Sequence, residues 1–236
     1  MISPIDFHDI VSGRRRGAGP SLARGLMRLA EVPYTLAVRT RNRRYDRGSA
    51  AVERVNVPVV SVGNLTLGGT GKTPMVKWLA GWFTERGLRV AIVSRGYGAA
   101  AGSQNDEARE VAQALPNVPH VQTPDRVAGA RRAIDEFGSQ LILLDDGFQH
   151  RRLARDLDIV LLDATEPFGF GHVFPRGTLR EPIEGLRRAG VVCLSRSDLL
   201  DESGRRTIQR QVANLAPHAV WCEAAHAPQG LLNSSG

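Results

Sequence analysis

The 236 residues, 42% of them hydrophobic and 23% charged, have the composition of one well-cored domain, or of one domain plus a fragment, with a formal net charge of +7. No run of about 18 apolar residues is present and the first residues lack the apolar core of a secretory signal, which argues against a spanning helix or signal peptide. We therefore expect a cytoplasmic chain, in which Cys193 and Cys222 lack metal-ligand spacing and are expected to be inert buried thiols.

The basic residues are concentrated at the N-terminal end. Residues 1–47 contain ten arginines and four acidic residues, and so carry a formal charge of +6. Apolar Leu22, Leu26, Leu29 and Ala30 recur there at helical spacing, which predicts a basic amphipathic helix. Such a helix can lie on an anionic membrane surface, although a solvated arginine-rich tail and an RNA-binding arm have the same charge. Because no base-reading motif accompanies the arginines, nucleic acid is the least favoured partner.

After residue 47, short β-branched apolar runs alternate with helical segments. Strands are predicted at 57–63, 89–96, 140–147, 157–164 and 190–198, and helices at 72–86, 107–115, 125–137 and 202–215. Continuous apolar strands between amphipathic helices are typical of a mostly parallel sheet with helices on both faces. The pattern therefore predicts an α/β core domain over residues 48–225.

The segment SVGNLTLGGTGKTP joins the first strand to the first helix of this core. It matches the phosphate-loop pattern G-x-x-x-x-G-K-[ST], except that Thr66 stands at the first glycine. In such a loop, backbone N–H groups face the phosphates, lysine reaches the terminal phosphates and the hydroxyl binds Mg²⁺. The candidate nucleotide-binding residues are Thr66, Leu67, Gly68, Gly69, Thr70, Gly71, Lys72 and Thr73. The alternative is a glycine turn in an unrelated α/β protein, but Lys72 is one of only two lysines in the chain.

A magnesium site of this kind also needs a carboxylate at the end of an apolar strand. Asp145 and Asp146 end the run LILLDD and are the candidate metal ligands. Either residue alone could instead form a turn, since Asp-Asp-Gly is a common turn sequence.

Five segments together resemble one family. They read VGNLTLGGTGKTP, SRGYG, DDGFQHRRLARDLDIVLLDA, FGFGHVFPRGTLREP and SRSDL, and they resemble the tetraacyldisaccharide 4'-kinases (the LpxK family) over about residues 20–230. In that family the loop beginning at Thr66 has its usual form. The resemblance implies a P-loop NTPase-like fold, ATP and Mg²⁺ as cofactors, and transfer of the γ-phosphoryl group to the 4'-hydroxyl of a tetraacyldisaccharide 1-phosphate, a lipid A precursor.

The resemblance also implies roles for single residues. Asp106, in the segment NDE, matches the catalytic base of the family and would act beside Lys72, although it can equally cap a helix that begins at Glu107. Arg95, Tyr97 and Arg180 are candidate substrate contacts, with surface salt bridges as the alternative. His150 could orient a carboxylate, touch the substrate or form a structural hydrogen bond.

The resemblance also implies that residues 1–47 attach the chain peripherally to the cytoplasmic face of the inner membrane. Two departures from the family stand out: only six residues separate SRGYG from NDE, and Asn105 replaces a glycine. Family members also continue into a smaller domain, of which residues 226–236 would be the truncated start. Two alternatives therefore remain, a P-loop regulatory NTPase, since SRSD faintly resembles a guanine-reading motif, and an ATP-binding remnant without turnover.

Overall fold

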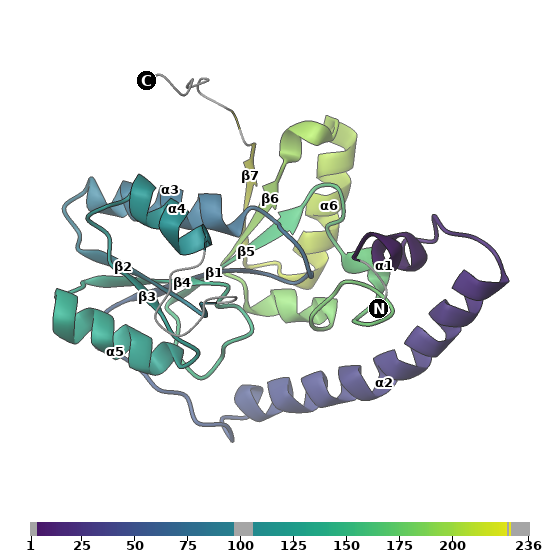
Figure 1. Cartoon of the computed structure of the whole chain (residues 1–236), viewed down its shortest axis with the longest axis horizontal. Coiled ribbons are helices and arrows are strands. Elements are labelled where there is room, and N and C mark those ends of the chain that lie inside the picture. Colours follow the sequence, from purple (N-terminus) through teal and green to yellow (C-terminus); the bar gives the residue numbers. More distant parts are fainter. Residues whose placement is uncertain (1–3, 97–105, 226, 228–236) are drawn as a thin grey trace.

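The computed structural model describes residues 4–96, 106–225 and 227, and its centre is a seven-stranded sheet (Figure 1). The strand order is β3-β2-β4-β1-β5-β6-β7, and neighbouring strands are parallel throughout. The strands are β1 (Val59–Asn64), β2 (Val90–Ser94), β3 (His120–Gln122), β4 (Leu141–Asp145), β5 (Leu157–Asp163), β6 (Val191–Ser195) and β7 (Val220–Ala224). The predicted parallel α/β fold is confirmed.

Helices cover both faces of the sheet (Figure 1). The α-helices are α1 (Pro4–Val11), α2 (Ala18–Asp46), α3 (Lys72–Thr84), α4 (Asp106–Ala114), α5 (Arg126–Phe137) and α6 (Glu202–Leu215), and the 3₁₀ turns are η1 (Gly169–Gly171), η2 (Ile183–Arg188) and η3 (Ser197–Leu199). One buried cluster joins α3 and α4 to the sheet, and two others join α5, α6 and η2 to the opposite face. Because both faces are covered, β1 and β2 are buried at every residue, which explains their continuous apolar sequences.

The helix ends follow from local chemistry. The Asp125 side chain accepts hydrogen bonds from the backbone N–H groups of Val127 and Ala128, so α5 begins after Asp125. The predicted helix at 72–86 ends earlier, at Thr84, and α4 begins at Asp106, one residue before the predicted start. Two short edge strands, β3 and β7, were not predicted. The β3 segment has only three residues, which is too short to show strand periodicity.

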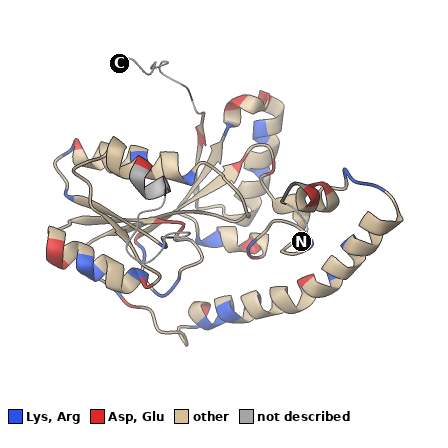
Figure 2. Cartoon of the chain, viewed as in Figure 1, with Lys and Arg blue, Asp and Glu red and all other residues tan. Residues whose placement is uncertain are grey.

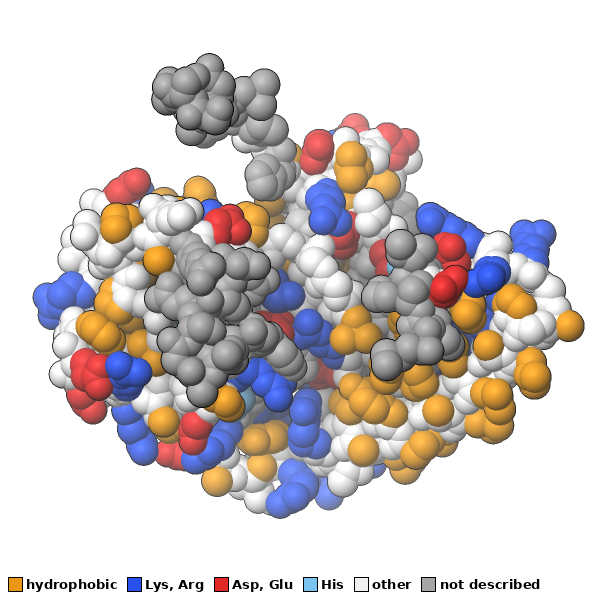
Figure 3. Space-filling model, viewed as in Figure 1, with side chains coloured by type: hydrophobic (Ala, Val, Ile, Leu, Met, Phe, Trp, Pro, Cys, Tyr) orange, Lys and Arg blue, Asp and Glu red, His pale blue; other side chains and the backbone are white. Residues whose placement is uncertain are grey.

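The N-terminal region has one helix more than the single amphipathic helix predicted. It contains two helices, α1 and α2, and α2 extends to Asp46 and continues through Pro33. The predicted apolar face is present and is not packed on the core: Leu22, Leu26 and Leu29 are 68%, 60% and 72% exposed. Figure 3 shows the corresponding hydrophobic side chains gathered at the lower right of the molecule. Among the helices of the described residues, none is both long and apolar enough to cross a bilayer.

Candidate functional site

The glycine-rich loop lies at the carboxyl end of β1, where it leads directly into α3 (Figure 1). Gly68 and Gly71 have φ angles of 115° and 83°, which side chains with a Cβ rarely adopt, and Gly71 immediately precedes α3. Thr66 does not have a positive φ angle. Among the described residues, the non-glycine residues with positive φ are Asp146, Phe170 and Arg196. A threonine therefore fits at this position without strain.

The start of the loop pairs with a distant segment. The Leu67 N–H group donates to the Thr178 carbonyl at 2.7 Å, and the Arg180 N–H group donates to the Leu65 carbonyl at 2.7 Å. Thr66, which is 5% exposed, bridges to Leu179 between these two hydrogen bonds. Thr66 and Leu67, which were predicted to bind nucleotide, are thus absent from the lining of the pocket beside the loop, but their pairing brings Arg180 to it.

A pocket of about 470 Å³ opens above the loop. Its lining contains these predicted site residues: Gly68, Gly69, Thr70, Gly71, Lys72, Thr73, Arg95, Asp145, Asp146 and Arg180. The lining also contains Ser94, Gly96 and Arg196, which were not predicted as site residues. Carboxyl ends of neighbouring parallel strands meet at one edge of the sheet, so the residues that follow β1, β2, β4 and β6 converge there.

Lys72 and Asp146 are the centre of this pocket. The Lys72 Nζ atom lies 3.2 Å from Asn64 Oδ1 and 3.6 Å from Asp146 Oδ1. The Arg180 Nη1 atom donates to both Asp146 carboxylate oxygens at 2.7 Å. Burial alone would raise the pKa of Asp146, but the charges of Lys72 and Arg180 outweigh burial and hold that pKa below its ordinary value. Asp146 is therefore ionised, and it holds both cations at the loop.

Arg196 contacts the loop from the other side. Its Nη2 atom donates to the Gly69 carbonyl at 3.2 Å, and its Nη1 atom forms an ion pair with Asp163 at the end of β5. The sequence contains a signal for Arg196 as a pocket residue, since it directly follows β6 in the segment SRSD. What the sequence lacked was the strand order, which places the ends of β5 and β6 beside the loop.

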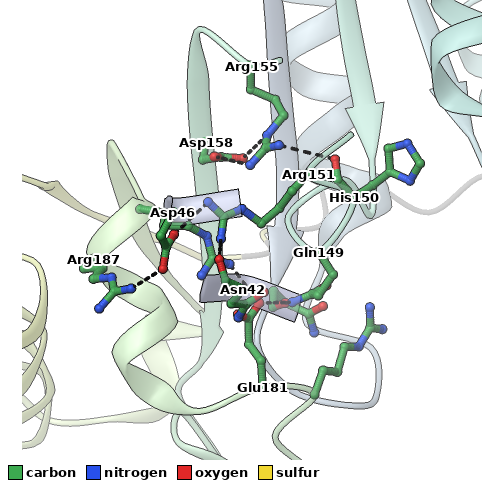
Figure 4. Close-up of polar contacts among 12 residues, drawn as sticks. Asn42, Asp46, Gln149, His150, Arg151, Arg155, Asp158, Glu181 and Arg187 are labelled. Carbon is green, nitrogen blue, oxygen red and sulfur yellow. Dashed lines mark hydrogen bonds and ion pairs between the residues drawn. The ribbon is translucent and has the colours of Figure 1, made fainter. Parts of the chain in front are cut away.

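The remaining predicted residues lie apart from this arrangement or outside the described residues. His150 is not part of the pocket lining, and in Figure 4 its ring points away from the side chains of Arg151 and Asp46. Burial, with the nearby charges of Arg126 and Arg155, lowers the pKa of His150 to about 4, so its ring is neutral near pH 7. Tyr97 lies outside the described residues, and so does the side chain of Asp106, the first residue of α4.

The oxygen-bearing residues of the pocket suit Mg²⁺. Thr73, Asp145 and Asp146 line the same pocket, and Mg²⁺ is usually held by one or two carboxylates together with water and substrate phosphates. Within the described residues, no group of three or more His, Cys, Asp or Glu side chains is placed to hold a metal ion. The donor set thus fits a metal that shares its coordination with a nucleotide better than one held by protein alone.

Comparison with known proteins gives one consistent result. The family described as tetraacyldisaccharide-1-P 4'-kinase matches residues 23–234. The tetraacyldisaccharide 4'-kinase of Anaeromyxobacter dehalogenans (strain 2CP-C) is 44% identical over 239 residues, covering 94% of this chain and 63% of that protein. The enzyme of that name from Geobacter sulfurreducens is 39% identical over 207 residues, covering 80% of this chain and 59% of that protein. The chain thus spans less than two thirds of the length of these relatives.

Solved structures agree with the fold. The LpxK protein of Aquifex aeolicus, in complex with ATP, matches with a TM-score of 0.67 and 26% identity, covering 88% of this chain and 83% of that one. The signal recognition particle receptor FtsY of Elizabethkingia anophelis matches with a TM-score of 0.50 and 15% identity, covering 76% of this chain and 61% of that one. The second likeness shows a shared fold alone.

Proposed function

Because the chain belongs to the tetraacyldisaccharide-1-P 4'-kinase family, we propose that it transfers the γ-phosphoryl group of ATP to the 4'-hydroxyl of a tetraacyldisaccharide 1-phosphate. The observation that carries the proposal is the position of Lys72, which lies at the loop between Asn64 and the ionised Asp146. Residues 48–225 form the proposed kinase core, and residues 1–47 the proposed membrane-facing region.

Phosphoryl transfer depends mainly on positioning and on neutralising charge. The loop N–H groups and Lys72 bind the β- and γ-phosphates, and Arg180 and Arg95 approach the same anion from the pocket wall. Thr73 with Asp145 or Asp146 would hold Mg²⁺, which when bound neutralises phosphate charge. On nucleotide binding, Lys72 exchanges its contact with Asp146 for the phosphates, while Arg180 keeps that carboxylate in place.

The acceptor hydroxyl must lose a proton as it attacks phosphorus. We propose that Asp106 accepts this proton. Asp106 is the first residue of α4 and matches the catalytic base of the family. Replacing a general base costs typically 10²–10⁴-fold in rate. The variant Asp106→Ala should therefore lower turnover by about that factor at unchanged ATP affinity, with Glu107→Gln as the control. An unaffected rate would remove Asp106 from this role.

The acceptor carries acyl chains, so the enzyme must reach a membrane surface. The exposed apolar side chains of α2 support attachment of this helix to the cytoplasmic face of the inner membrane, with the helix lying along the surface. The contacts of α2 with the core are made by its opposite side, through Glu31, Tyr34 and Asn42.

One assay tests the activity directly. The purified chain is incubated with γ-labelled ATP, Mg²⁺ and a tetraacyldisaccharide 1-phosphate in detergent, and the lipid is then separated from free phosphate. Label in the lipid supports the kinase. Release of phosphate without labelled lipid indicates a regulatory NTPase, and absence of both products indicates an ATP-binding remnant.

A further inference from the structure

A second pocket lies between the last turns of α2 and η2, with a volume of about 230 Å³. We call it the α2–η2 groove. The charged side chains that line it are Arg39, Arg43, Asp46, Glu184, Arg187 and Arg188. Four arginines thus face two carboxylates, and none of these residues lines the nucleotide pocket. The groove is a separate basic site.

Two of the four arginines already have protein partners. The Arg187 Nη2 atom lies 2.6 Å from Asp46 Oδ2, and Arg151 lies 2.8 Å from the other oxygen of that carboxylate. Burial would raise the pKa of Asp46, but Arg151 and Arg187 outweigh it and lower that pKa, so the carboxylate stays ionised. The Arg188 Nη2 atom donates to the fully buried Glu181 at 2.9 Å (Figure 4 shows this surrounding network).

Arg39 and Arg43 differ from Arg187 and Arg188. Both are exposed, and within the described part of the chain neither guanidinium has a hydrogen-bond or ion-pair partner. They are four residues apart on one side of α2, where like charges repel each other and destabilise a helix. A bound anion between them would remove this repulsion. Arginine forks are suited to phosphate oxygens, because two N–H groups can donate to the same group.

The groove continues the exposed apolar face of α2. Leu22, Leu26, Leu29, Val32 and Leu36 form that face, and Arg39 follows Leu36 by one helical turn. Figure 2 shows basic residues gathered towards the C-terminal end of α2. Arg39 and Arg43 follow Leu36 by one and two turns on the same side of α2, so when the apolar face enters the boundary of the acyl chains their long side chains can reach the lipid phosphates.

We propose that the α2–η2 groove binds the phosphate of an anionic phospholipid headgroup through Arg39 and Arg43, which rests on the membrane attachment proposed above. The groove gives α2 a fixed position on the membrane, because the apolar face alone allows sliding and rotation. We assign the groove to a membrane lipid and not to free phosphate, since the cations continue the exposed apolar face of α2, which acyl chains can cover and free phosphate cannot. The acceptor phosphate is a poorer candidate, because the groove and the nucleotide pocket share no lining residue.

The test is co-sedimentation of the full chain with phosphatidylcholine vesicles, with and without phosphatidylglycerol, in the absence of ATP and acceptor. The variant R39Q/R43Q is compared with R41Q/R44Q, which removes the same charge from exposed positions of the same helix outside the groove. A basic residue near an anionic surface contributes about 1 kcal/mol. R39Q/R43Q should therefore bind phosphatidylglycerol vesicles about 30-fold more weakly, and R41Q/R44Q no more than about threefold more weakly.

Further outcomes separate this proposal from membrane attachment itself. Equal losses in the two variants would mean diffuse attraction and overturn the groove, while leaving attachment intact. If the unaltered chain binds neither kind of vesicle, both proposals fail. The variant L26E/L29E should lose binding to both kinds, which reports on the apolar face. If the unaltered chain binds inorganic phosphate in solution and R39Q/R43Q does not, while R39Q/R43Q and R41Q/R44Q bind phosphatidylglycerol vesicles equally, the groove takes free phosphate and the lipid assignment is wrong. Thermal unfolding midpoints check that each variant is folded.

Discussion

The nucleotide pocket and helix α2 are built in opposite ways. The pocket begins as one continuous segment, since Asn64, the glycine turn and Lys72 lie within nine residues and need only β1 and α3 to hold them. Helix α2 is held by contacts such as Tyr34 with Arg180 and Asn42 with Glu181, whose partners are 146 and 139 residues apart in the chain. The phosphate loop is thus encoded locally, whereas the position of α2 depends on the folded core.

One segment serves both regions. Asp146 faces Lys72, and three residues later the Gln149 Nε2 atom donates to the Asn64 carbonyl at 2.9 Å and to Glu181 at 3.0 Å. Arg151 then binds Asp46 of α2. The segment 146–151 therefore connects the phosphate loop to the helix that we place on the membrane.

The largest expected effect is on the stability of this connection. Glu181 is fully buried and accepts from Asn42, Gln149 and Arg188. Removing one partner of a buried ion pair costs about 3–5 kcal/mol, so Glu181→Ala should lower the free energy of unfolding by about that amount. Denaturant titration measures it, with the nearby exposed Glu184→Ala as control. A loss below about 0.5 kcal/mol, typical of surface sites, would show that α2 and the core are not joined through this carboxylate.

The next effect concerns the pocket alone. Removing one preorganised charge donor to a transferring group costs about 10²–10³-fold in turnover, so Lys72→Ala should reduce lipid phosphorylation by at least that factor. The stability of this variant should change little, since among the described residues the Lys72 ammonium contacts Asn64 and Asp146, and Arg180 still pairs with Asp146. The control is Lys77→Ala, which removes the other lysine, a residue paired with Glu110 outside the pocket. Equal activity of the two variants would contradict the assignment.

A smaller effect is expected for Arg180, which the pairing of residues 65–67 with 178–180 brings to the pocket. Arg180→Ala should lower kcat/KM by at least about tenfold, because a hydrogen bond to a charged group contributes about 1.5–3 kcal/mol and its loss leaves Lys72 as the remaining cation on Asp146 among the described residues. The exposed Arg210→Ala on α6 removes the same charge and should have wild-type kinetics. If both variants behave alike, Arg180 only provides net charge.

The last effect is on the pH dependence of stability and involves His150, in the segment 146–151. The pKa of His150 falls from 6.5 to about 4 in the folded chain. The unfolded chain therefore binds more protons between these values, so stability is complete above pH 6.5 and is lost as pH falls towards 4. The variant His150→Gln should weaken this slope, and urea midpoints at pH 7.5 and 5 measure it. The slope should persist in part, because burial also lowers the pKa of His120. Identical slopes in both proteins would contradict the prediction.

Much of the fold could be predicted because its signals are local. The five predicted strands are largely apolar because both faces of the sheet are covered, and the phosphate loop is specified by glycines that positive φ angles require. The edge strands β3 and β7 were missed since they are short or partly exposed, and so lack this continuous pattern.

The sequence by itself thus determined the parallel α/β core, the phosphate loop and the identity of most pocket residues, because each depends on neighbours along the chain. Only the tertiary structure decided that Arg196 reaches Gly69, that Arg180 neutralises Asp146, and that the apolar side of α2 points outwards. Those features depend on strand order and on contacts between residues far apart in the chain. Such contacts form only after the sheet has brought the strand ends together, and no periodicity in the sequence encodes them.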